Sequence, residues 1–413
     1  MAFTSDLLCI LKRKLDEHIS ECTSSDGNGP YLNAVIAGVS TNKETVYFKS
    51  AGVRNIETGE PVKDDDIFAL FSCTKAITSM GLFKLYEENK VDLDRPVKEY
   101  LPEIVDFKVI EKGLVNYDGS YKTIPKESTT DITIKHLLLH TSGFSYGMLD
   151  ADYVKLASKI RPNVDIATEA FLFPSRALFT PETMPLKFDP GSNWLYGHST
   201  DFLGLVIEKI TGKFLGEYLK EVIFDPAGMT SCTFHIRDPS NIIKTHTLGD
   251  DGSLSLHGEW IINLDPEIDM GGHGCFSNAE DYLKFMRIFL LGGLSPDTGE
   301  RILKKETIEY MVQNHLPTGL FLPDDANSFP IERDGIPPDG FTLSGHAFGF
   351  CELTTRRPEE SLSWGGLPNI FYWMDLKNGI AGFWGSQIIP MGHITCAKMY
   401  EKFESYVYEF CSC

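Results

Sequence analysis

Hydrophobic and polar positions follow two different periods along this chain, and the strand-like period is concentrated near its two ends. Residues 7–22 have the spacing of an amphipathic helix, and 31–40 and 44–53 have the pattern of two strands. Because turn residues 41–43 separate those strands, we predict a β-hairpin. Strand patterns return late in the chain, ahead of a last helix over 397–410, and they cover 348–354, 361–364, 370–375 and 380–387.

Between these strand-rich ends the pattern is mostly helical. Apolar positions recur at helical spacing over 72–83, 134–140, 199–210, 214–223 and 278–291. Polar, Gly-rich and Pro-rich stretches predict loops at 90–104, 113–130 and 315–345. Strands at both ends with helices between them predict an α/β (α+β) fold. Its sheet domain, 1–66 and 270–413, is interrupted by a mostly helical domain, 67–269.

The net charge of −20 at pH 7 narrows the partners that this chain is expected to bind. Nucleic acid and anionic membranes both favour clusters of Lys and Arg, and no long basic run is present, so we expect neither partner. No apolar run is long enough to span a bilayer, and the N-terminus lacks the features of a signal peptide. Nine cysteines, an odd number without a framework spacing, fit free thiols in a reducing compartment. We therefore expect a cytosolic protein.

The tetrapeptide Ser72-Cys73-Thr74-Lys75 lies where an apolar run, 67–71, passes into a helical pattern. Positions three apart are neighbours on a helix, so the Lys75 amine is expected within about one turn of the Ser72 hydroxyl. A serine hydroxyl becomes a good nucleophile when a neighbouring group accepts its proton, and a lysine can do so. The alternative is structural, because a serine at this place can also cap the helix while the lysine is solvated.

Two further motifs carry candidate chemistry. Tyr196 follows a Pro-Gly turn and precedes the helix that begins near Ser199. A nearby ammonium would favour its phenolate, which could act as general base toward Ser72, although a packed aromatic residue is the alternative. Trp364-Gly365-Gly366 lies on a predicted late strand. Paired glycines allow a ligand to approach the strand backbone, whose N–H could hold an oxyanion, and a β-bulge is the alternative.

Together these motifs resemble those of the serine β-lactamase and penicillin-recognising superfamily, in particular its class C β-lactamase, family VIII carboxylesterase and fungal lovastatin-type acyltransferase branch. Ser72-x-x-Lys75 matches the nucleophile motif, Tyr196-Gly197-His198 the Tyr-x-Asn position, and Trp364-Gly365-Gly366 the Lys-Thr-Gly strand. Order and spacing agree, and supporting stretches match at 91–94, 138–143 and 271–277. The resemblance implies a β-lactamase/transpeptidase-like fold, in which an antiparallel sheet flanked by helices adjoins a mostly helical domain and the active site lies between them.

The resemblance also assigns expected roles and shows where this chain departs from the pattern. It implies that backbone N–H groups of Ser72 and Leu367 hold the oxyanion and that Gly366 lets the substrate approach. By similarity to the fungal acyltransferases, Tyr146 would line the acyl pocket. His198 replaces an asparagine that holds the side-chain amide of a β-lactam, and it could bind substrate, tune Tyr196 or be structural. Trp364 replaces a lysine that meets the substrate carboxylate.

These departures favour neutral ester or thioester substrates over β-lactams. We expect a serine esterase or acyltransferase that works through an acyl-enzyme on Ser72, with a small-molecule acyl donor and with water or an alcohol as acceptor. The alternatives are a β-lactamase or D-amino-acid peptidase, and a non-catalytic binding relative. We expect no cofactor. We also expect no metal, because His136 and His140, four residues apart, have no glutamate base between them.

Overall fold

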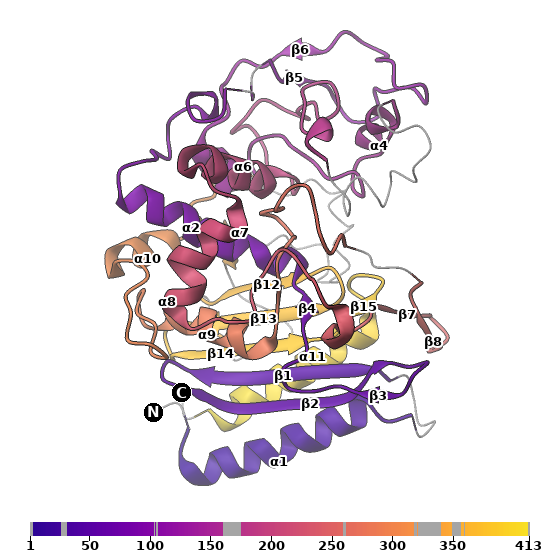
Figure 1. Cartoon of the computed structure of the whole chain (residues 1–413), viewed down its shortest axis with the longest axis vertical. Helices are drawn as coiled ribbons and strands as arrows, with labels where there is room; N and C mark the ends of the chain where they lie inside the picture. Colours follow the sequence, from indigo (N-terminus) through magenta and orange to yellow (C-terminus); the bar gives the residue numbers. More distant parts are fainter. Residues whose placement is uncertain are drawn as a thin grey trace.

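An antiparallel sheet of eight strands organises the part of the molecule that contains both ends of the chain (Figure 1). The computed structural model describes residues 3–25, 31–102, 104, 106–159, 175–258, 262–317, 320, 340–348, 357–358 and 360–411. Within them the strand order is β10 (Gly340–Phe341), β11 (Ala347–Phe348), β12 (Leu362–Gly366), β13 (Ile370–Asp375), β14 (Ile380–Gly385), β1 (Ala34–Thr41), β2 (Thr45–Asn55) and β3 (Glu60–Pro61).

The pairing of β1 with β14 joins the two ends of the chain in one sheet. Ile36 of the N-terminal hairpin lies opposite Gly385, and the register continues to Thr41 opposite Ile380. The predicted hairpin is confirmed, because β1 and β2 pair directly. The predicted α/β (α+β) class is confirmed as well, with the antiparallel sheet flanked by helices.

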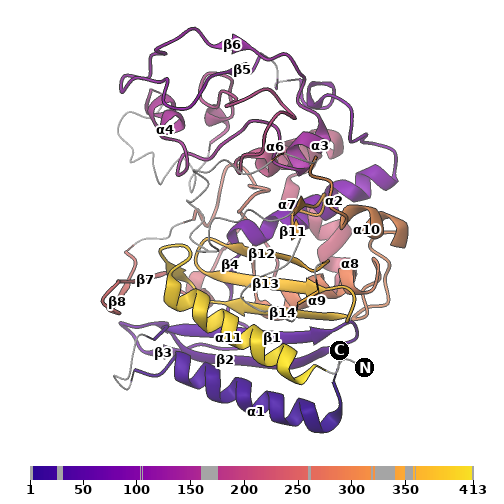
Figure 2. The same cartoon turned by 180° about the vertical axis from the view of Figure 1, so that it is seen from behind.

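Helices cover both faces of this sheet. α1 (Ser5–Cys22) and α11 (Ile394–Phe410) pack against each other, and α1 also contacts β2 (Figure 2). α9 (Ala279–Leu290) packs on β1 and β14 and belongs to the core on the opposite face. Its N-cap, Asn278, accepts a hydrogen bond from the Asp281 N–H, which fixes the start of the predicted 278–291 helix.

The central strands β1, β13 and β14 are largely apolar on both sides because helices cover both sides of the sheet there. Successive side chains of a strand point to opposite faces. On β1, Val35, Ala37 and Val39 therefore pack with α1 and α11, whereas Ala34 and Ile36 belong to the core cluster that includes α2 and α9. This double burial explains why the predicted strands read as continuous apolar runs.

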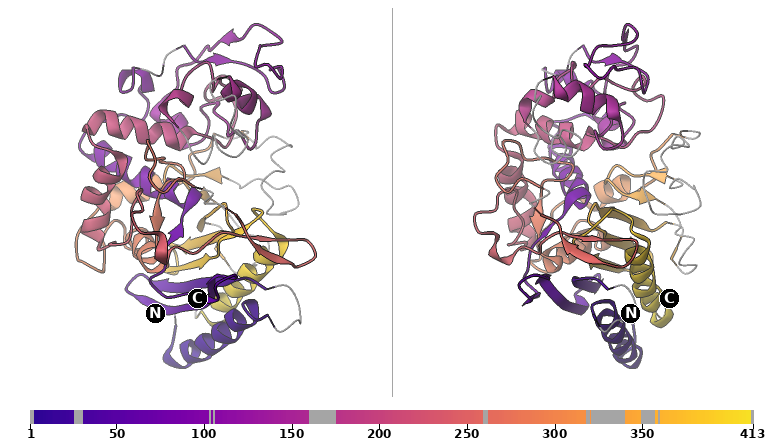
Figure 3. Two further views of the ribbon diagram at one scale, coloured as in Figure 1. Left: turned by 45° about the vertical axis from the view of Figure 1, so that its right-hand side comes forward. Right: turned by 90° about the vertical axis from the view of Figure 1, so that its right-hand side faces the viewer.

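A second group of elements stacks above the sheet, around a buried helix. α2 (Thr74–Glu87) is buried on nearly all sides and packs against α6 (Ser199–Thr211) and α7 (Leu215–Leu219). In Figure 3 the magenta segments form the end of the molecule farthest from α1. Within the described residues the other α-helices are α3 (Ile134–Leu138), α4 (Ala151–Ser158), α8 (Asp225–Ala227) and α10 (Lys305–Met311). Short helical turns lie at Phe71–Cys73, Val97–Glu99, Arg176–Leu178, Lys220–Phe224 and Pro239–Asn241.

The middle of the chain is less helical than its pattern predicts. It contributes strands to small sheets, two of which also include strands from later in the chain. The pairings are β4 (Phe68–Ala69) with β9 (Phe276–Ser277), β5 (Lys108–Val109) with β6 (Lys126–Glu127), and β7 (His246–Leu248) with β8 (Leu254–Leu256) and β15 (Ile388–Ile389). Strands of two or three residues are too short to show a period. The predicted helix 214–223 is α7 followed by a π-helical turn.

Some predictions lie partly outside the described residues, namely the strand at 348–354 and much of the loop at 315–345. The domain boundaries at 66/67 and 269/270 stay a prediction. Cys9, Cys22, Cys73, Cys232, Cys275 and Cys396 are free thiols, as expected, but Cys411 is disulfide-bonded, and its short Cys-Ser-Cys context gave no signal of this. Among the described helices, none combines the length and apolar character needed to cross a bilayer.

Candidate active site

A strained turn carries Ser72. The chain leaves β4 and enters a 3-10 turn, Phe71–Cys73, before α2 begins at Thr74. Phe71 has a φ of +47°, a conformation that costs free energy for a bulky residue and that clusters at functional sites. Ser72 is thus in the turn ahead of α2 and is not the N-cap of that helix, which is Cys73. The structural alternative of a capping serine is therefore wrong.

Two side chains reach the Ser72 hydroxyl. The Lys75 amine donates a hydrogen bond of 3.2 Å to Ser72 Oγ, and the Tyr196 hydroxyl donates one of 2.7 Å. Tyr196 lies just before α6 in a segment held by the Leu195 N–H, which donates to the carbonyl of His140. The serine, lysine and tyrosine that the sequence singled out therefore form one hydrogen-bonded cluster.

Lys75 is fully buried among acceptors that carry no charge. Besides Ser72, its amine donates to the Tyr146 hydroxyl at 3.1 Å and to the Gly272 carbonyl at 2.8 Å. Burial lowers the pKa of Lys75 to about 7, with Asp201 acting in the opposite direction. Both the ammonium and the free amine are consequently accessible near neutral pH.

Burial has the opposite consequence for the phenol of Tyr196. It raises the pKa of Tyr196 above its ordinary value, although the hydrogen bonds to Ser72 and Trp364 act to lower it. The Lys75 amine also lies 4.5 Å from the centre of the Tyr196 ring. Near neutral pH, Tyr196 is accordingly a protonated donor while Lys75 is the group that can lose its proton.

The end of strand β12 borders this cluster. The indole N–H of Trp364 donates to the Tyr196 hydroxyl at 3.4 Å, and the two rings lie 5.4 Å apart. Gly366 lies against Leu70, the residue before the turn that carries Ser72, because a Cβ on it would be 2.6 Å from the Leu70 carbonyl. The absence of a side chain at Gly366 therefore lets the backbone of Leu70 approach strand β12 closely. Leu367, half-buried, is the next residue.

Behind Lys75 lies a carboxylate that the sequence reasoning missed. Tyr146 is fully buried, and its hydroxyl donates to Asp201 at 3.5 Å. His198 forms a hydrogen bond of 2.8 Å between its Nδ1 and the same carboxylate. His198 thus faces Asp201, its neighbour three positions later at the start of α6. That three-residue spacing was the only local signal that could have found Asp201.

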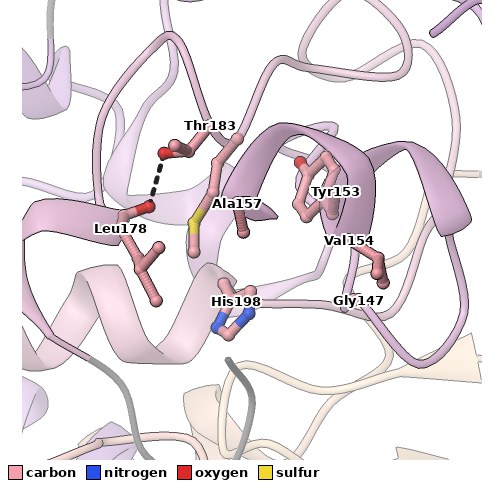
Figure 4. Close-up of a pocket in the computed structure, with 8 residues that line it drawn as sticks. Gly147, Tyr153, Val154, Ala157, Leu178, Thr183 and His198 are labelled. Carbon is pink, nitrogen blue, oxygen red and sulfur yellow. Dashed lines mark hydrogen bonds between the residues drawn. The ribbon is translucent and has the colours of Figure 1, made fainter. Parts of the chain in front are cut away.

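A small hollow, open to solvent on one side, lies beside His198 (Figure 4). Its wall is largely apolar and includes Tyr153, Val154 and Leu178. Tyr146 is not among the residues that line it. The role of Tyr146 in an acyl pocket stays a prediction, and its observed place is between Lys75 and Asp201.

An antiparallel sheet built from both ends of the chain, with a Ser-x-x-Lys turn packed against one of its strands, defines the β-lactamase-like class of proteins. Residues 31–387 match the model of the family described as Beta-lactamase, and the chain belongs to that family.

Several fungal enzymes are similar to this chain over most of its length. The chain is 30% identical to ML-236A carboxylate methylbutanoyltransferase of Penicillium citrinum, over 92% of this chain and 91% of that protein. It is 28% identical to lovastatin esterase of Penicillium rubens, over 92% and 95%. The solved structure of a simvastatin synthase (LovD) mutant from Aspergillus terreus superposes with a TM-score of 0.78, covering 98% of each chain at 24% identity, which supports the fold.

Proposed function

We propose that this protein is a serine acyl-transfer enzyme that takes an acyl group from a small-molecule ester or thioester onto Ser72. The observation that carries the proposal is the contact of one hydroxyl, Ser72 Oγ, with Lys75 at 3.2 Å and Tyr196 at 2.7 Å. Such contacts can activate a serine because a neighbouring group accepts the proton of its hydroxyl. Relatives that include a methylbutanoyltransferase and an esterase support the same reading.

Each residue of the cluster has its own role in the proposed acyl transfer. Ser72 Oγ bonds to the carbonyl carbon while its proton passes to the Lys75/Tyr196 pair, with the free amine of Lys75 as acceptor. The backbone N–H groups of Ser72 and Leu367 hold the oxyanion, a role supported by the packing of β12 on the Ser72 turn. Tyr196 then protonates the leaving alcohol or thiol. Water or a second alcohol reverses these steps and releases the acyl group.

Two contacts support neutral substrates. A β-lactam carboxylate would need a cation at the Trp364 position, and the indole N–H there already donates to Tyr196. The Nδ1 of His198 is bound to Asp201, so this side of the ring does not take the place of an amide that holds a β-lactam side chain. We therefore propose acyl donors without a carboxylate next to the reacting carbonyl. The cytosolic location stays a prediction.

Intact-protein mass after incubation with a panel of short-chain and branched esters and thioesters tests the proposal. We expect a mass increase equal to the acyl group, mapped to Ser72 by peptide sequencing and missing from Ser72→Ala. Adding candidate alcohols should divert product from the free acid to a new ester if the enzyme is a transferase. Absence of an adduct with every donor would contradict the proposal, and turnover of a chromogenic cephalosporin would favour the β-lactamase alternative.

A further inference from the structure

Asp201 has an unusually complete set of partners for a buried carboxylate. It is 1% exposed and sits in the first turn of α6. One oxygen accepts from the Gly272 N–H at 2.6 Å and lies 3.6 Å from His273 Nδ1. The other bonds to His198 Nδ1 at 2.8 Å and accepts from the Tyr146 hydroxyl at 3.5 Å. Burial alone would raise the pKa of Asp201, but its interactions with His273 and His198 outweigh burial and lower that pKa. Asp201 is therefore a carboxylate at neutral pH.

Two short routes connect this carboxylate with Lys75. In the first, the Tyr146 hydroxyl accepts from the Lys75 amine at 3.1 Å and donates to Asp201. In the second, Gly272 accepts from Lys75 through its carbonyl at 2.8 Å and donates to Asp201 through its N–H. The fit around Gly272 is close, because a Cβ there would lie 2.5 Å from Asp201 Oδ1 and 2.9 Å from the Tyr146 oxygen.

We propose that Asp201 is the buried counter-charge of Lys75 and a positioning residue of the active site, acting through Tyr146 and Gly272. The proposal deepens the proposed function and rests on it for its catalytic meaning. A carboxylate one hydroxyl away favours the ammonium form of a buried lysine, whereas direct contact would hold the proton too firmly for a base. Asp201 would thus set the pH at which Lys75 becomes able to accept the Ser72 proton.

Other titratable groups face this pair, and none of them supplies the same charge. His140 and Tyr146 lie in the segment before α4, Tyr196 and His198 precede α6, and Cys73 is on the Ser72 turn. His273 approaches from the segment that contains Gly272. Burial lowers the pKa of His140 and of His198 and raises that of Tyr146, so all three are neutral near pH 7.

The chain offers a matched control in Asp269. It is 3% exposed, accepts from the Gly216 N–H at 2.8 Å and bonds to His235 Nε2 at 3.0 Å. It therefore repeats the glycine and histidine contacts of Asp201 without the link to Lys75 through Tyr146. Asp269→Asn removes a similar buried charge and measures the structural part of the effect.

Titration of Lys75 by NMR, with lysine labelled at Cε, tests the proposal without using activity. The Lys75 signal is assigned by its loss in Lys75→Met. We expect a wild-type midpoint of about 7. In Asp201→Asn the midpoint should fall by roughly one pH unit or more, and in Asp269→Asn it should stay at the wild-type value. An unchanged midpoint in Asp201→Asn, or an equal shift in the control, would overturn the proposal.

A second measurement relates this shift to catalysis. The acid limb of kcat/KM for an ester that acylates Ser72 should move to lower pH in Asp201→Asn by the same amount. A merely structural role would lower kcat/KM equally at every pH and leave the limb in place, which would also overturn the proposal. If no ester acylates Ser72 but the NMR midpoint moves, the counter-charge stands and the proposed function fails.

If Asp201→Asn does not fold, Tyr146→Phe tests the same proposal. Tyr146→Phe keeps the buried ring and removes only the hydroxyl between Lys75 and Asp201. We expect it to lower the Lys75 midpoint in the same direction. A midpoint unchanged in this variant would count against the proposal by itself.

Discussion

Lys75 and Arg287 are both buried cations, but their surroundings differ in kind. Arg287, on α9, donates to both oxygens of Asp297, at 2.9 and 2.7 Å. Among the described residues, Lys75 donates only to uncharged oxygen atoms, and the nearby carboxylate, Asp201, lies one hydroxyl farther away. The surroundings of Arg287 therefore hold a permanent positive charge, whereas those of Lys75 hold an ammonium that can lose its proton.

The chemistry of the two side chains fits this difference. A guanidinium stays protonated in proteins and binds carboxylates through two parallel bonds, whereas a buried ammonium readily loses its proton. Arg287 also donates to Ser40 and Thr45, so it ties α9 to the β1–β2 hairpin. A buried cation therefore marks a structural contact between α9 and the sheet in one place and the proposed reactive site on α2 in the other, and the partners of each cation distinguish the two.

Replacing Lys75 should have the largest effect on activity. Lys75→Met removes the acceptor of the Ser72 proton, and we expect kcat/KM for an acylating ester to fall by about 10³-fold or more while the protein stays folded. Lys84→Met is the control on the same helix, since the Lys84 amine donates to the Ile302 carbonyl, away from Ser72. A Lys75→Met variant with a tenth of the wild-type kcat/KM would contradict the assignment.

Replacing Arg287 should affect stability instead. Arg287→Met removes the buried guanidinium from the Asp297 carboxylate, which is itself partly exposed to solvent, and we expect the free energy of unfolding in urea to fall by about 1.5–3 kcal/mol. The kcat/KM of the protein that remains folded should be unchanged, because Arg287 does not contact the Ser72 cluster. Arg301→Met, at an exposed arginine that donates to the Gly292 carbonyl, should change stability by well under half as much. A large loss of kcat/KM in folded Arg287→Met would break the distinction between the two cations.

The sequence predicts Lys75 itself, but it predicts the groups around Lys75 less well. Ser72 and Lys75 are three residues apart, so a local pattern suffices to bring them together, and resemblance to a known motif adds Tyr196. Asp201 belongs to the site through Gly272 and Tyr146, which are 71 and 55 positions away, and no local period encodes such contacts. The 3-10 turn at Ser72 was missed for a related reason, since a spacing of three fits both that turn and an α-helix.

The helices and strands show the same limit, because a local sequence pattern predicts only elements that are long enough to show a period. The long helices α1, α6, α9 and α11 and the hairpin were predicted because their periods extend over many residues. The strands β4 and β9 were not, although they pair with each other to hold the segment before Ser72. Their pairing of Phe68 with Ser277 depends on tertiary contacts alone.

The pH dependence of stability should distinguish the two cations, because only Lys75 is expected to contribute to it. The pKa of Lys75 is lowered from its ordinary value to about 7, so the unfolded chain binds one more proton than the folded protein between about pH 7 and the ordinary lysine pKa. Lys75 therefore costs stability, fully below about pH 7, and this cost disappears as the pH rises through that window. We expect wild type to gain stability relative to Lys75→Met between pH 7 and 9.5 in urea unfolding. An equal difference at both pH values would contradict the lowered pKa, and Arg287→Met should show no such dependence relative to wild type.

The smallest effect is expected at the edge of the reactive site, at Trp364. Trp364→Phe keeps an aromatic ring beside Tyr196 and removes the indole N–H that donates to its hydroxyl at 3.4 Å. A single neutral hydrogen bond contributes about 1 kcal/mol, so we expect kcat for an acylating ester to fall by roughly three- to tenfold, with KM nearly unchanged.

Trp194→Phe is the matched control for this variant. Its ring stacks near Tyr196, with the ring centres 6.2 Å apart, but its indole nitrogen has no hydrogen-bond partner among the described residues. Equal losses in the two variants would mean that aromatic packing, and not donation to the Tyr196 hydroxyl, supports catalysis. A loss confined to KM in Trp364→Phe would instead place this side chain in substrate binding. The split between kcat and KM thus decides whether the tryptophan that replaces a lysine tunes the proton donor or only shapes the site.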